Sequence, residues 1–149
     1  MIINQMEITF GALSINEGFA RSCVAAFCVQ ANPSLDELTD IKTAVSEAVT
    51  NCVVHAYPKK RGDITIQVFL YDNHTVKINV IDYGIGIKNF EQAMEPFYTS
   101  KPQQERSGMG FTVMQSFMDS VVLSKGENGG LVVTMEKKFG EVNKVAIGC

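Results

Sequence analysis

The chain has 149 residues, 46% of them hydrophobic, which is enough to bury the core of one ordinary domain. Its formal net charge of -3 leaves no excess positive field with which to hold a nucleic acid backbone, so direct binding to DNA or RNA is disfavoured. The sequence has neither a secretory leader nor an apolar stretch long enough to span a membrane, and we expect a soluble cytoplasmic protein.

The cysteines do not form a metal-binding pattern. Cys23, Cys28, Cys52 and Cys149 lack the close paired spacing of zinc ligands, and two histidines could not easily complete such a site. We therefore interpret them as reduced and mostly buried thiols, as is usual in the cytoplasm.

Two helices are predicted near the start of the chain. A serine followed three residues later by a glutamate is typical of a capping box, and this pattern occurs at Ser14 with Glu17 and at Ser34 with Glu37. The patterns predict helices over about residues 14–30 and 34–56, the second ending at Tyr57-Pro58. The second helix has a continuous apolar face, formed by Leu38, Ile41, Val45, Ala48, Val49 and Cys52.

Alternating apolar and polar residues predict two antiparallel hairpins. The first pairs residues 64–70 with 76–80 and has one buried face. The second pairs residues 120–124 with 131–139 across the glycine-containing turn KGENGG. Residues 6–10 are expected to add an edge strand.

Residues 83–108 are less regular. Their glycines, prolines and the polar run TSKPQQERS predict a long loop with a short helix near 89–95 and a lid at about 95–108. A helix over about 109–119 follows, and residues 140–149 are expected to form a tail. The core side of that helix is predicted to carry Met109, Val113, Phe117 and Met118. These elements predict an α+β two-layer sandwich, in which helices cover one face of a mixed, mainly antiparallel sheet in a single domain over residues 1–149.

Polar side chains recur every four residues on the second helix. Glu47, Asn51 and His55 are spaced so that they share one helical face. Such a stripe most often marks only a solvated surface. Asp82, at the end of the first hairpin, could accept a hydrogen bond from a ligand's amino group, although an aspartate there more often caps a turn.

Two glycine pairs are further candidates, in DYGIGI at residues 82–87 and in RSGMGF at residues 106–111. Neither pair has the additional glycine of a Rossmann fingerprint or the form of a Walker A motif. The second pair opens a helix, so Gly108 and Gly110 would present backbone N–H groups to an anion such as a polyphosphate. The alternative is that these glycines only serve turns.

The order and spacing of these segments resemble one family. EAVTN on a helix, DYGIG after a hairpin and GMGF after a polar lid are similar to the N, G1 and G2 boxes of the Bergerat-fold (GHKL) ATPases and kinases. Within that family, ALSINEGFAR, LDELTDIKTAVSEAVTN, PFYTSKP and ERSGMGF resemble the small anti-sigma factor serine kinases, most closely the sporulation anti-sigma F group. The resemblance covers roughly residues 6–136.

The resemblance implies that the chain uses MgATP to phosphorylate a serine of another protein. Asn51 matches the asparagine that helps to hold Mg2+ against the nucleotide phosphates. Glu47, one turn earlier, is expected to accept the proton of the attacking hydroxyl as general base, or at least to orient that hydroxyl. Asp82 matches the carboxylate that reads the adenine amino group, and Gly84 and Gly86 let the backbone approach the base and sugar.

Other carried-over positions lie in the lid and the last hairpin. Lys101 and Arg106 are expected to neutralise phosphate charge, Arg106 more so because it is close to Gly108, and Thr99 could touch a phosphate. The alternative for each is an ordinary loop side chain. Relatives carry Gly-Thr near the start of the last strand, whereas this chain has Gly129-Gly130 there and Thr134 further on, which puts the hydroxyl near the adenine in doubt.

The resemblance also implies the partners. They are a sporulation sigma factor of the sigma F type that the chain inhibits, an anti-anti-sigma protein that it phosphorylates, and a second copy in a homodimer. Glu17 and Arg21 fall in the partner-binding region, although such a pair is usually only an exposed ion pair. Open alternatives are a stress-response anti-sigma B type kinase, a nucleotide-dependent binding module without kinase activity, and a histidine-kinase or chaperone-type ATPase domain.

Overall fold

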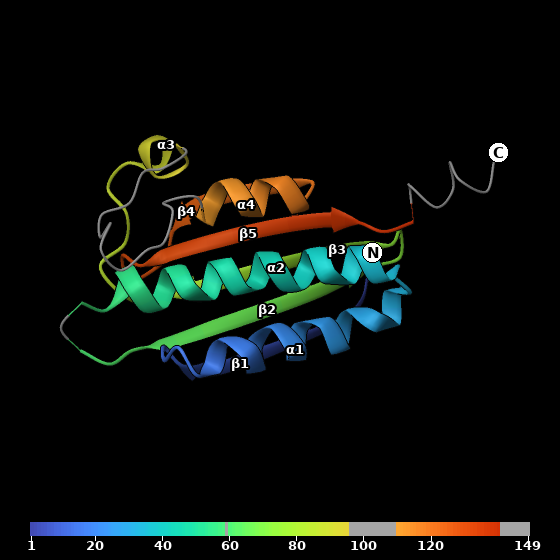
Figure 1. Cartoon of the computed structure of the whole chain (residues 1–149), viewed down its shortest axis with the longest axis horizontal. Coiled ribbons are helices and arrows are strands. Elements are labelled where there is room, and N and C mark those ends of the chain that lie inside the picture. Colours follow the sequence, from blue (N-terminus) through green and yellow to red (C-terminus); the bar gives the residue numbers. More distant parts are fainter. Residues whose placement is uncertain (59, 96–109, 141–149) are drawn as a thin grey trace.

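The computed structural model describes residues 1–58, 60–95 and 110–140, which form one sheet and one layer of helices (Figure 1). The strands are β1 Ile2–Gly11, β2 Asp63–Tyr71, β3 Thr75–Asp82, β4 Ser120–Lys125 and β5 Leu131–Lys138. The helices are α1 Asn16–Cys28, α2 Leu35–Asn51, α3 Phe90–Ala93 and α4 Gly110–Phe117.

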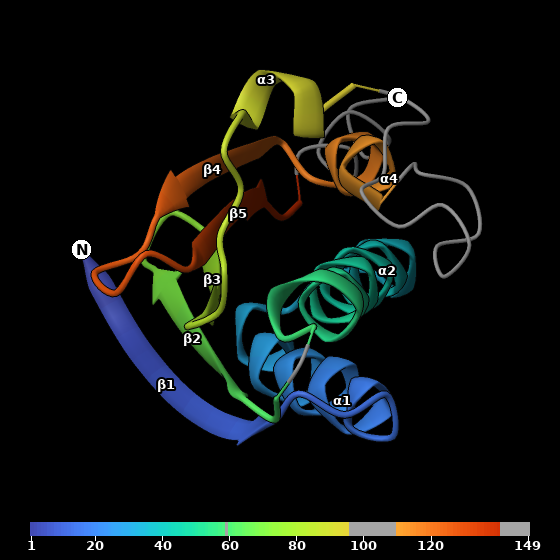
Figure 2. The same cartoon turned by 90° about the vertical axis from the view of Figure 1, so that its left-hand side faces the viewer.

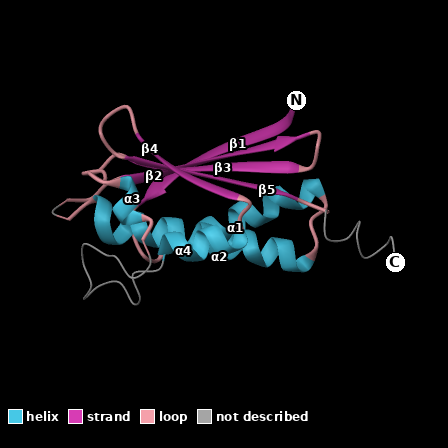
Figure 3. Ribbon diagram, turned by 90° about the horizontal axis from the view of Figure 1, so that it is seen from above, coloured by secondary structure: helices cyan, strands magenta, loops and turns pink. Residues whose placement is uncertain are grey.

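The sheet has the order β1-β2-β3-β5-β4, and each neighbouring pair is antiparallel. The predicted α+β two-layer sandwich is confirmed, but no parallel pair occurs among these five strands, so the sheet is antiparallel rather than mixed. Viewed end-on, the sheet curves around the helices, and α2 lies between α1 and α4 (Figure 2). Viewed from above, the strands lie on one side and the helices on the other (Figure 3).

Both predicted hairpins form. Their alternating apolar residues point into the sandwich, because successive side chains of a strand face opposite sides of the sheet. The buried set from β2, β3 and β5 comprises Ile64, Ile66, Val68, Leu70, Val76, Ile78, Val80, Leu131, Val133 and Met135. β1 is the predicted edge strand, and it is longer than expected because it pairs with β2 from Ile2 to Gly11.

The second predicted helix is confirmed, with a change of type near its end. Ser34 Oγ accepts a hydrogen bond from the Glu37 backbone N–H at 3.1 Å, and Glu37 Oε1 accepts one from the Ser34 N–H at 2.8 Å, so this capping box forms. The predicted apolar face is buried except for Leu38, which is partly buried. After Asn51 the chain continues as a π-helical turn over Cys52–Ala56.

The capping box predicted at Ser14 does not form. α1 begins at Asn16, its first turn has no side-chain cap, and the Glu17 N–H is satisfied by the backbone oxygen of Ser14 at 3.2 Å. The Glu17 carboxylate binds Arg21 and Ser46 instead. α1 is therefore shorter than predicted and is followed by a 3-10 turn over Val29–Ala31.

The core face of α4 was predicted partly wrongly. Met118 is buried as expected, but Val113 and Phe117 are only half-buried, and Met109 lies outside the described residues. The buried side chains of the helix are Phe111 and Met114, because packing against α2 rotates the helix relative to the predicted stripe.

Three of the cysteines lie in the described part of the chain. Cys23, Cys28 and Cys52 are free thiols, the latter two buried, while Cys149 lies outside the described residues. Within the same described ranges, none of the helices has both the length and the apolar character needed to cross a membrane.

The capping box of α2 provides a test of the fold. Ser34→Ala should lower the free energy of unfolding by about 1 kcal/mol, because the Glu37 N–H then loses its partner. Ser14→Ala is the matched control, since that serine provides no side-chain cap, and it should change stability by less than about 0.5 kcal/mol. Urea unfolding followed by circular dichroism measures both, and equal effects of the two substitutions would contradict the assignment.

Candidate functional site

The candidate site lies at one end of the sandwich. β3 ends where β5 begins, since Ile81 pairs with Val132, and the loop after β3 reaches the last turn of the α2 segment through a hydrogen bond from the Ile85 N–H to the Ala56 oxygen at 3.0 Å. α4 ends at the opposite end of the sheet, where Lys137 Nζ donates to the Phe117 oxygen at 2.7 Å. The beginning of α4 is therefore at the same end as the loop (Figure 1).

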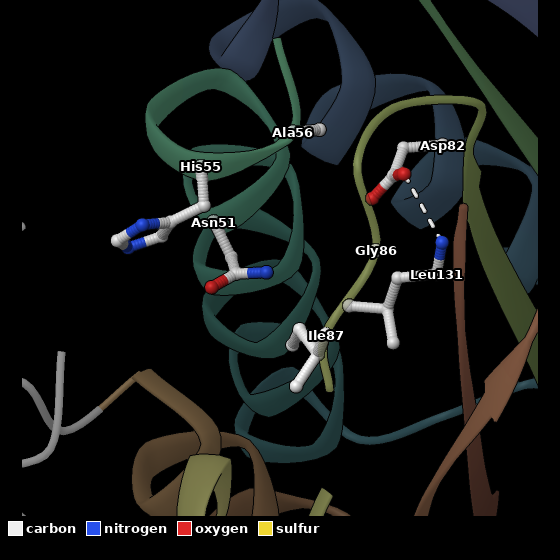
Figure 4. A pocket seen from close by; sticks show the side chains of 7 residues that line it. All are labelled: Asn51, His55, Ala56, Asp82, Gly86, Ile87 and Leu131. Atoms are coloured by element: carbon white, nitrogen blue, oxygen red, sulfur yellow. Dashed lines mark hydrogen bonds between the residues drawn. The ribbon is translucent and has the colours of Figure 1, made fainter. Parts of the chain in front are cut away.

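A pocket opens at this end, and its lining joins two of the predicted motifs (Figure 4). The lining residues are Asn51, His55, Ala56, Asp82, Gly86, Ile87 and Leu131. Asn51 is the last residue of α2, His55 lies on the π turn, and Asp82 is the last residue of β3. Asn51 and His55 of the polar stripe and the carboxylate before the glycine loop thus line one cavity.

Asp82 is 3% exposed, and backbone groups hold its carboxylate. Oδ1 accepts hydrogen bonds from the N–H groups of Gly84 and Leu131, each at 3.1 Å. Oδ2 accepts one from the Cys52 thiol, with 3.7 Å between sulfur and oxygen. A buried carboxylate with two backbone donors is well oriented, and its remaining acceptor capacity faces the pocket.

Gly84 and Gly86 are required by close approaches of the backbone. A Cβ on Gly84 would lie 2.0 Å from the backbone oxygen of Ala56, so only glycine lets the loop contact the π turn. Gly86 has a φ of 73° and a Cβ there would lie 2.3 Å from the backbone oxygen of Gly129. These glycines therefore hold the loop between the helix layer and the β4–β5 turn.

The departure at Gly129-Gly130 also has a steric basis. A Cβ on Gly130 would lie 2.1 Å from the backbone oxygen of Asp82, so in this structure position 130 has no room for a side chain. Thr134 is not a substitute for the missing hydroxyl, because its Oγ1 donates to Asn79 Oδ1 at 2.8 Å on the face of the sheet away from the helices. The Leu131 N–H contacts Asp82 directly instead.

Tyr57 joins the start of β2 to the loop that follows β3. Its hydroxyl donates to the Asp63 oxygen at 2.6 Å and accepts from the Tyr83 N–H at 2.7 Å. Burial, opposed by the Tyr83 N–H and assisted by the charge of Asp82, raises the pKa of Tyr57 above its ordinary value, so the phenol stays protonated and can donate. The loop after Asp82 is thus held at Tyr83 by this hydroxyl and at Ile85 by the Ala56 oxygen.

The other predicted residues are placed as follows. Glu47 lies on α2 one turn before Asn51 and is half-buried, but it is not among the described residues that line the pocket. Gly110 is the first residue of α4. Four predictions lie outside the described residues, namely Thr99, Lys101, Arg106 and Gly108.

Glu17 and Arg21 form the predicted pair on α1. Arg21 Nη1 lies 2.6 Å from both carboxylate oxygens of Glu17. A hydrogen bond from Ser46 is the main cause that lowers the pKa of Glu17, opposed by burial and assisted by Arg21. The pair therefore links α1 to α2, next to Glu47.

Comparison with known proteins identifies the family. The profile of the histidine kinase-like ATPase domain matches residues 14–137. The anti-sigma F factor of Caldanaerobacter subterraneus subsp. tengcongensis is 52% identical over 137 residues, which covers 92% of this chain and 95% of the relative. This chain belongs to the anti-sigma F factor family. The anti-sigma F factor of Clostridium acetobutylicum is 51% identical over 139 residues, covering 93% and 96% of the two chains.

Two solved structures share the fold of this chain. The RsbU and RsbW domains of a Mycobacterium tuberculosis protein superpose with a TM-score of 0.65 at 18% identity, over 91% of this chain and 32% of that one. A histidine kinase domain from Erythrobacter litoralis gives a TM-score of 0.57 at 14% identity, over 83% and 61% of the two chains. Membership in the ATPase family implies that this anti-sigma F family member binds ATP.

Several residues of the pocket were not predicted as functional. Ala56 and Ile87 supply apolar wall, Leu131 supplies a backbone donor, and Cys52 contacts Asp82 from the core. The sequence pattern indicates only that Cys52 belongs to the apolar face of its helix. The glycine pair at 129–130 was the one available signal that another backbone approaches there.

The contact of Gly130 with Asp82 provides a second test. Gly130→Ala should lower the free energy of unfolding by about 1–3 kcal/mol and weaken ATP binding, because the new Cβ displaces Asp82. Gly126→Ala in the same turn is the control. A Cβ on Gly126 would lie no closer than 3.4 Å to any other atom, so this substitution should leave both the stability and the ATP affinity nearly unchanged. Isothermal titration calorimetry and thermal melts measure the two effects, and normal ATP affinity in Gly130→Ala would contradict the geometry.

Proposed function

We propose that this chain is a cytoplasmic anti-sigma factor that binds and inhibits a sporulation sigma factor of the sigma F type. We further propose that it transfers the γ-phosphoryl group of MgATP to a serine of its anti-anti-sigma antagonist. The observation that carries the kinase proposal is that Asn51 and Asp82 line one pocket while Glu47 lies one helical turn before Asn51. The sigma factor follows from the names of relatives that are 52% and 51% identical over most of the chain.

The base and phosphate ends of the nucleotide would bind at different parts of the pocket. Asp82 Oδ2 would accept a hydrogen bond from the exocyclic amino group of adenine. The phosphates would extend past Asn51 toward the beginning of α4. Gly110, with the lid residues Thr99, Lys101, Arg106 and Gly108, would bind the phosphates there. Free N–H groups at a helix start and cationic side chains both stabilise phosphate charge.

The donor set suits Mg2+ held mainly by the nucleotide. Asn51 offers a neutral amide oxygen, and Asp82 is the one carboxylate among the described residues of the lining. Mg2+ typically keeps several waters and takes few protein ligands beside phosphate oxygens, which fits a single neutral ligand. When bound, the ion would neutralise charge on the β- and γ-phosphates.

Glu47 would act on the incoming serine. Its carboxylate would accept the proton of the serine hydroxyl as the new oxygen–phosphorus bond forms and the bond from the γ-phosphorus to the β-phosphate oxygen breaks, leaving ADP. At a minimum it would orient the hydroxyl in line with that bond. Its half-buried place on a regular helix gives it a fixed direction.

The partner surface would include α1. Arg21 is 42% exposed while Glu17 holds one end of its guanidinium, so further N–H donors remain available to an acidic side chain of a partner. A homodimer would present two such surfaces. The alternative of a nucleotide-dependent binding module shares the pocket and α1 but has no role for Glu47.

The kinase proposal is tested with the antagonist protein and MgATP. Wild type should add one phosphoryl group to the antagonist, whereas Glu47→Gln should slow the transfer about a hundredfold or more because the amide cannot accept a proton. Glu127→Gln, an exposed residue of the β4–β5 turn, is the matched control and should react normally. Intact-mass spectrometry follows the reaction. If wild type binds ATP but the mass of the antagonist does not change, the binding-module alternative is favoured. If Glu47→Gln transfers the phosphoryl group as fast as wild type, the general-base role is excluded.

The α1 surface is tested by sigma factor binding. Arg21→Ala should weaken binding of the purified sigma factor roughly tenfold, as expected when a charged contact at an interface is removed. Lys42→Ala on α2 is the control for loss of one positive charge. Surface plasmon resonance measures both, and an unchanged affinity for Arg21→Ala would remove this residue from the interface.

A further inference from the structure

The two oxygens of the Asp82 carboxylate have different surroundings. Oδ1 accepts two backbone hydrogen bonds of 3.1 Å, from Gly84 and Leu131. Oδ2 is contacted by the Cys52 thiol, at 3.7 Å between sulfur and oxygen. A carboxylate oxygen offers about two lone-pair positions, so Oδ1 is fully used whereas Oδ2 keeps capacity for a donor in the pocket.

Cys52 reaches this oxygen from the core. It is the first residue of the π turn, directly after Asn51, and it is 1% exposed within the hydrophobic cluster between α2 and the sheet. An ordinary thiol is protonated at neutral pH, so the sulfur can donate to the carboxylate across this contact.

A thiol has the right strength for such a contact. It is a weak donor, so it orients a carboxylate oxygen without competing strongly against an N–H group of a ligand. Because the sulfur is fixed by the surrounding apolar side chains, the direction of Oδ2 is fixed as well. The thiol contact adds to the restraint from the backbone donors on Oδ1, and it acts directly on the oxygen that would meet the ligand.

We infer that Cys52 is a positioning residue for nucleobase recognition. Its thiol holds Asp82 Oδ2 in the orientation in which this oxygen accepts a hydrogen bond from the exocyclic amino group of adenine. The inference rests on the proposed function, in which Asp82 reads the base. It predicts that loss of the thiol weakens binding of a base that carries the amino group. Binding of a base without that group does not depend on the direction of Oδ2 and changes much less.

Purine riboside triphosphate isolates this contact, because it is ATP without the exocyclic amino group. Isothermal titration calorimetry gives the Kd of both nucleotides for wild type, Cys52→Ala and Cys52→Val. Alanine is smaller than cysteine and valine is larger, and neither has a donor, so an effect common to both variants comes from the lost hydrogen bond and not from a change in packing volume. The preference for ATP should fall about three- to tenfold in both, through weaker ATP binding.

Cys28→Ala is the matched control. Cys28 is also a fully buried thiol, and burial raises its pKa to about 12, but it lies at the end of α1 and is not among the described residues of the pocket. Its loss should lower the melting temperature and leave the preference within twofold of wild type. An unchanged preference in Cys52→Val, with normal ATP binding by wild type, would overturn the inference and leave the proposed function intact. Failure of wild type to bind ATP would instead overturn the proposed function.

A measurement on the unsubstituted thiol covers the case in which the Cys52 variants do not fold. ATP should shift one S–H stretching band of the wild-type protein in the infrared, because the adenine amino group shares the charge of Oδ2 and weakens the thiol hydrogen bond. Purine riboside triphosphate should leave that band in place, and the ATP-dependent shift should persist in Cys28→Ala. S–H bands that stay unshifted at saturating ATP would overturn the inference.

Discussion

The geometry of the site depends on the contact between Gly84 and the end of the α2 segment. The missing Cβ lets the loop after β3 approach the Ala56 oxygen, which then accepts the Ile85 N–H at 3.0 Å. This contact joins the helix layer to the sheet layer at the point where the sheet's buried side chains end. The contact holds the loop that follows Asp82 against the helical segment that carries Asn51, so that Ala56 and Gly86 line the same pocket as these two side chains.

The opposite end of the sandwich is fastened by charge. Lys137 extends from the inner face of β5, donates to the Phe117 oxygen at the end of α4 and lies 3.3 Å from Asp40 of α2. Its side chain is 12% exposed, so the ion pair is little screened by water. Glu37 adds a second link, since its carboxylate accepts the Gly140 N–H at 3.0 Å. One end of the helical layer is thus held by these contacts, while the other presents backbone and polar groups to the pocket.

The two oxygens of Asp82 have different surroundings, one structural and one open to the pocket, which fits the binding role proposed for this residue. Backbone donors bind one oxygen, and the second is reached by a core thiol and by the pocket. The same division applies to the π turn, whose buried side carries Cys52 and whose open side carries His55. Extra backbone at the end of an α-helix is common at functional sites, since it redirects side chains that a regular helix would bury or expose together.

The sequence by itself determined the elements whose periodicity is local: both hairpins, the capped start of α2 with its apolar face, and the place of Asp82 before a glycine loop. Those features depend on side-chain alternation and on capping within a few residues, which a linear pattern records. Only the tertiary structure decided the start of α1, the rotation of α4 and the role of Gly130, because each depends on a group distant in sequence. The Glu17 side chain binds Ser46 of α2 instead of forming the predicted capping box with Ser14. The backbone oxygen of Asp82 excludes a side chain at position 130. Cys52 is a core residue, as predicted, and the structure shows that it is also a neighbour of the site: its partner Asp82 lies at the end of β3, and no local pattern can report that contact.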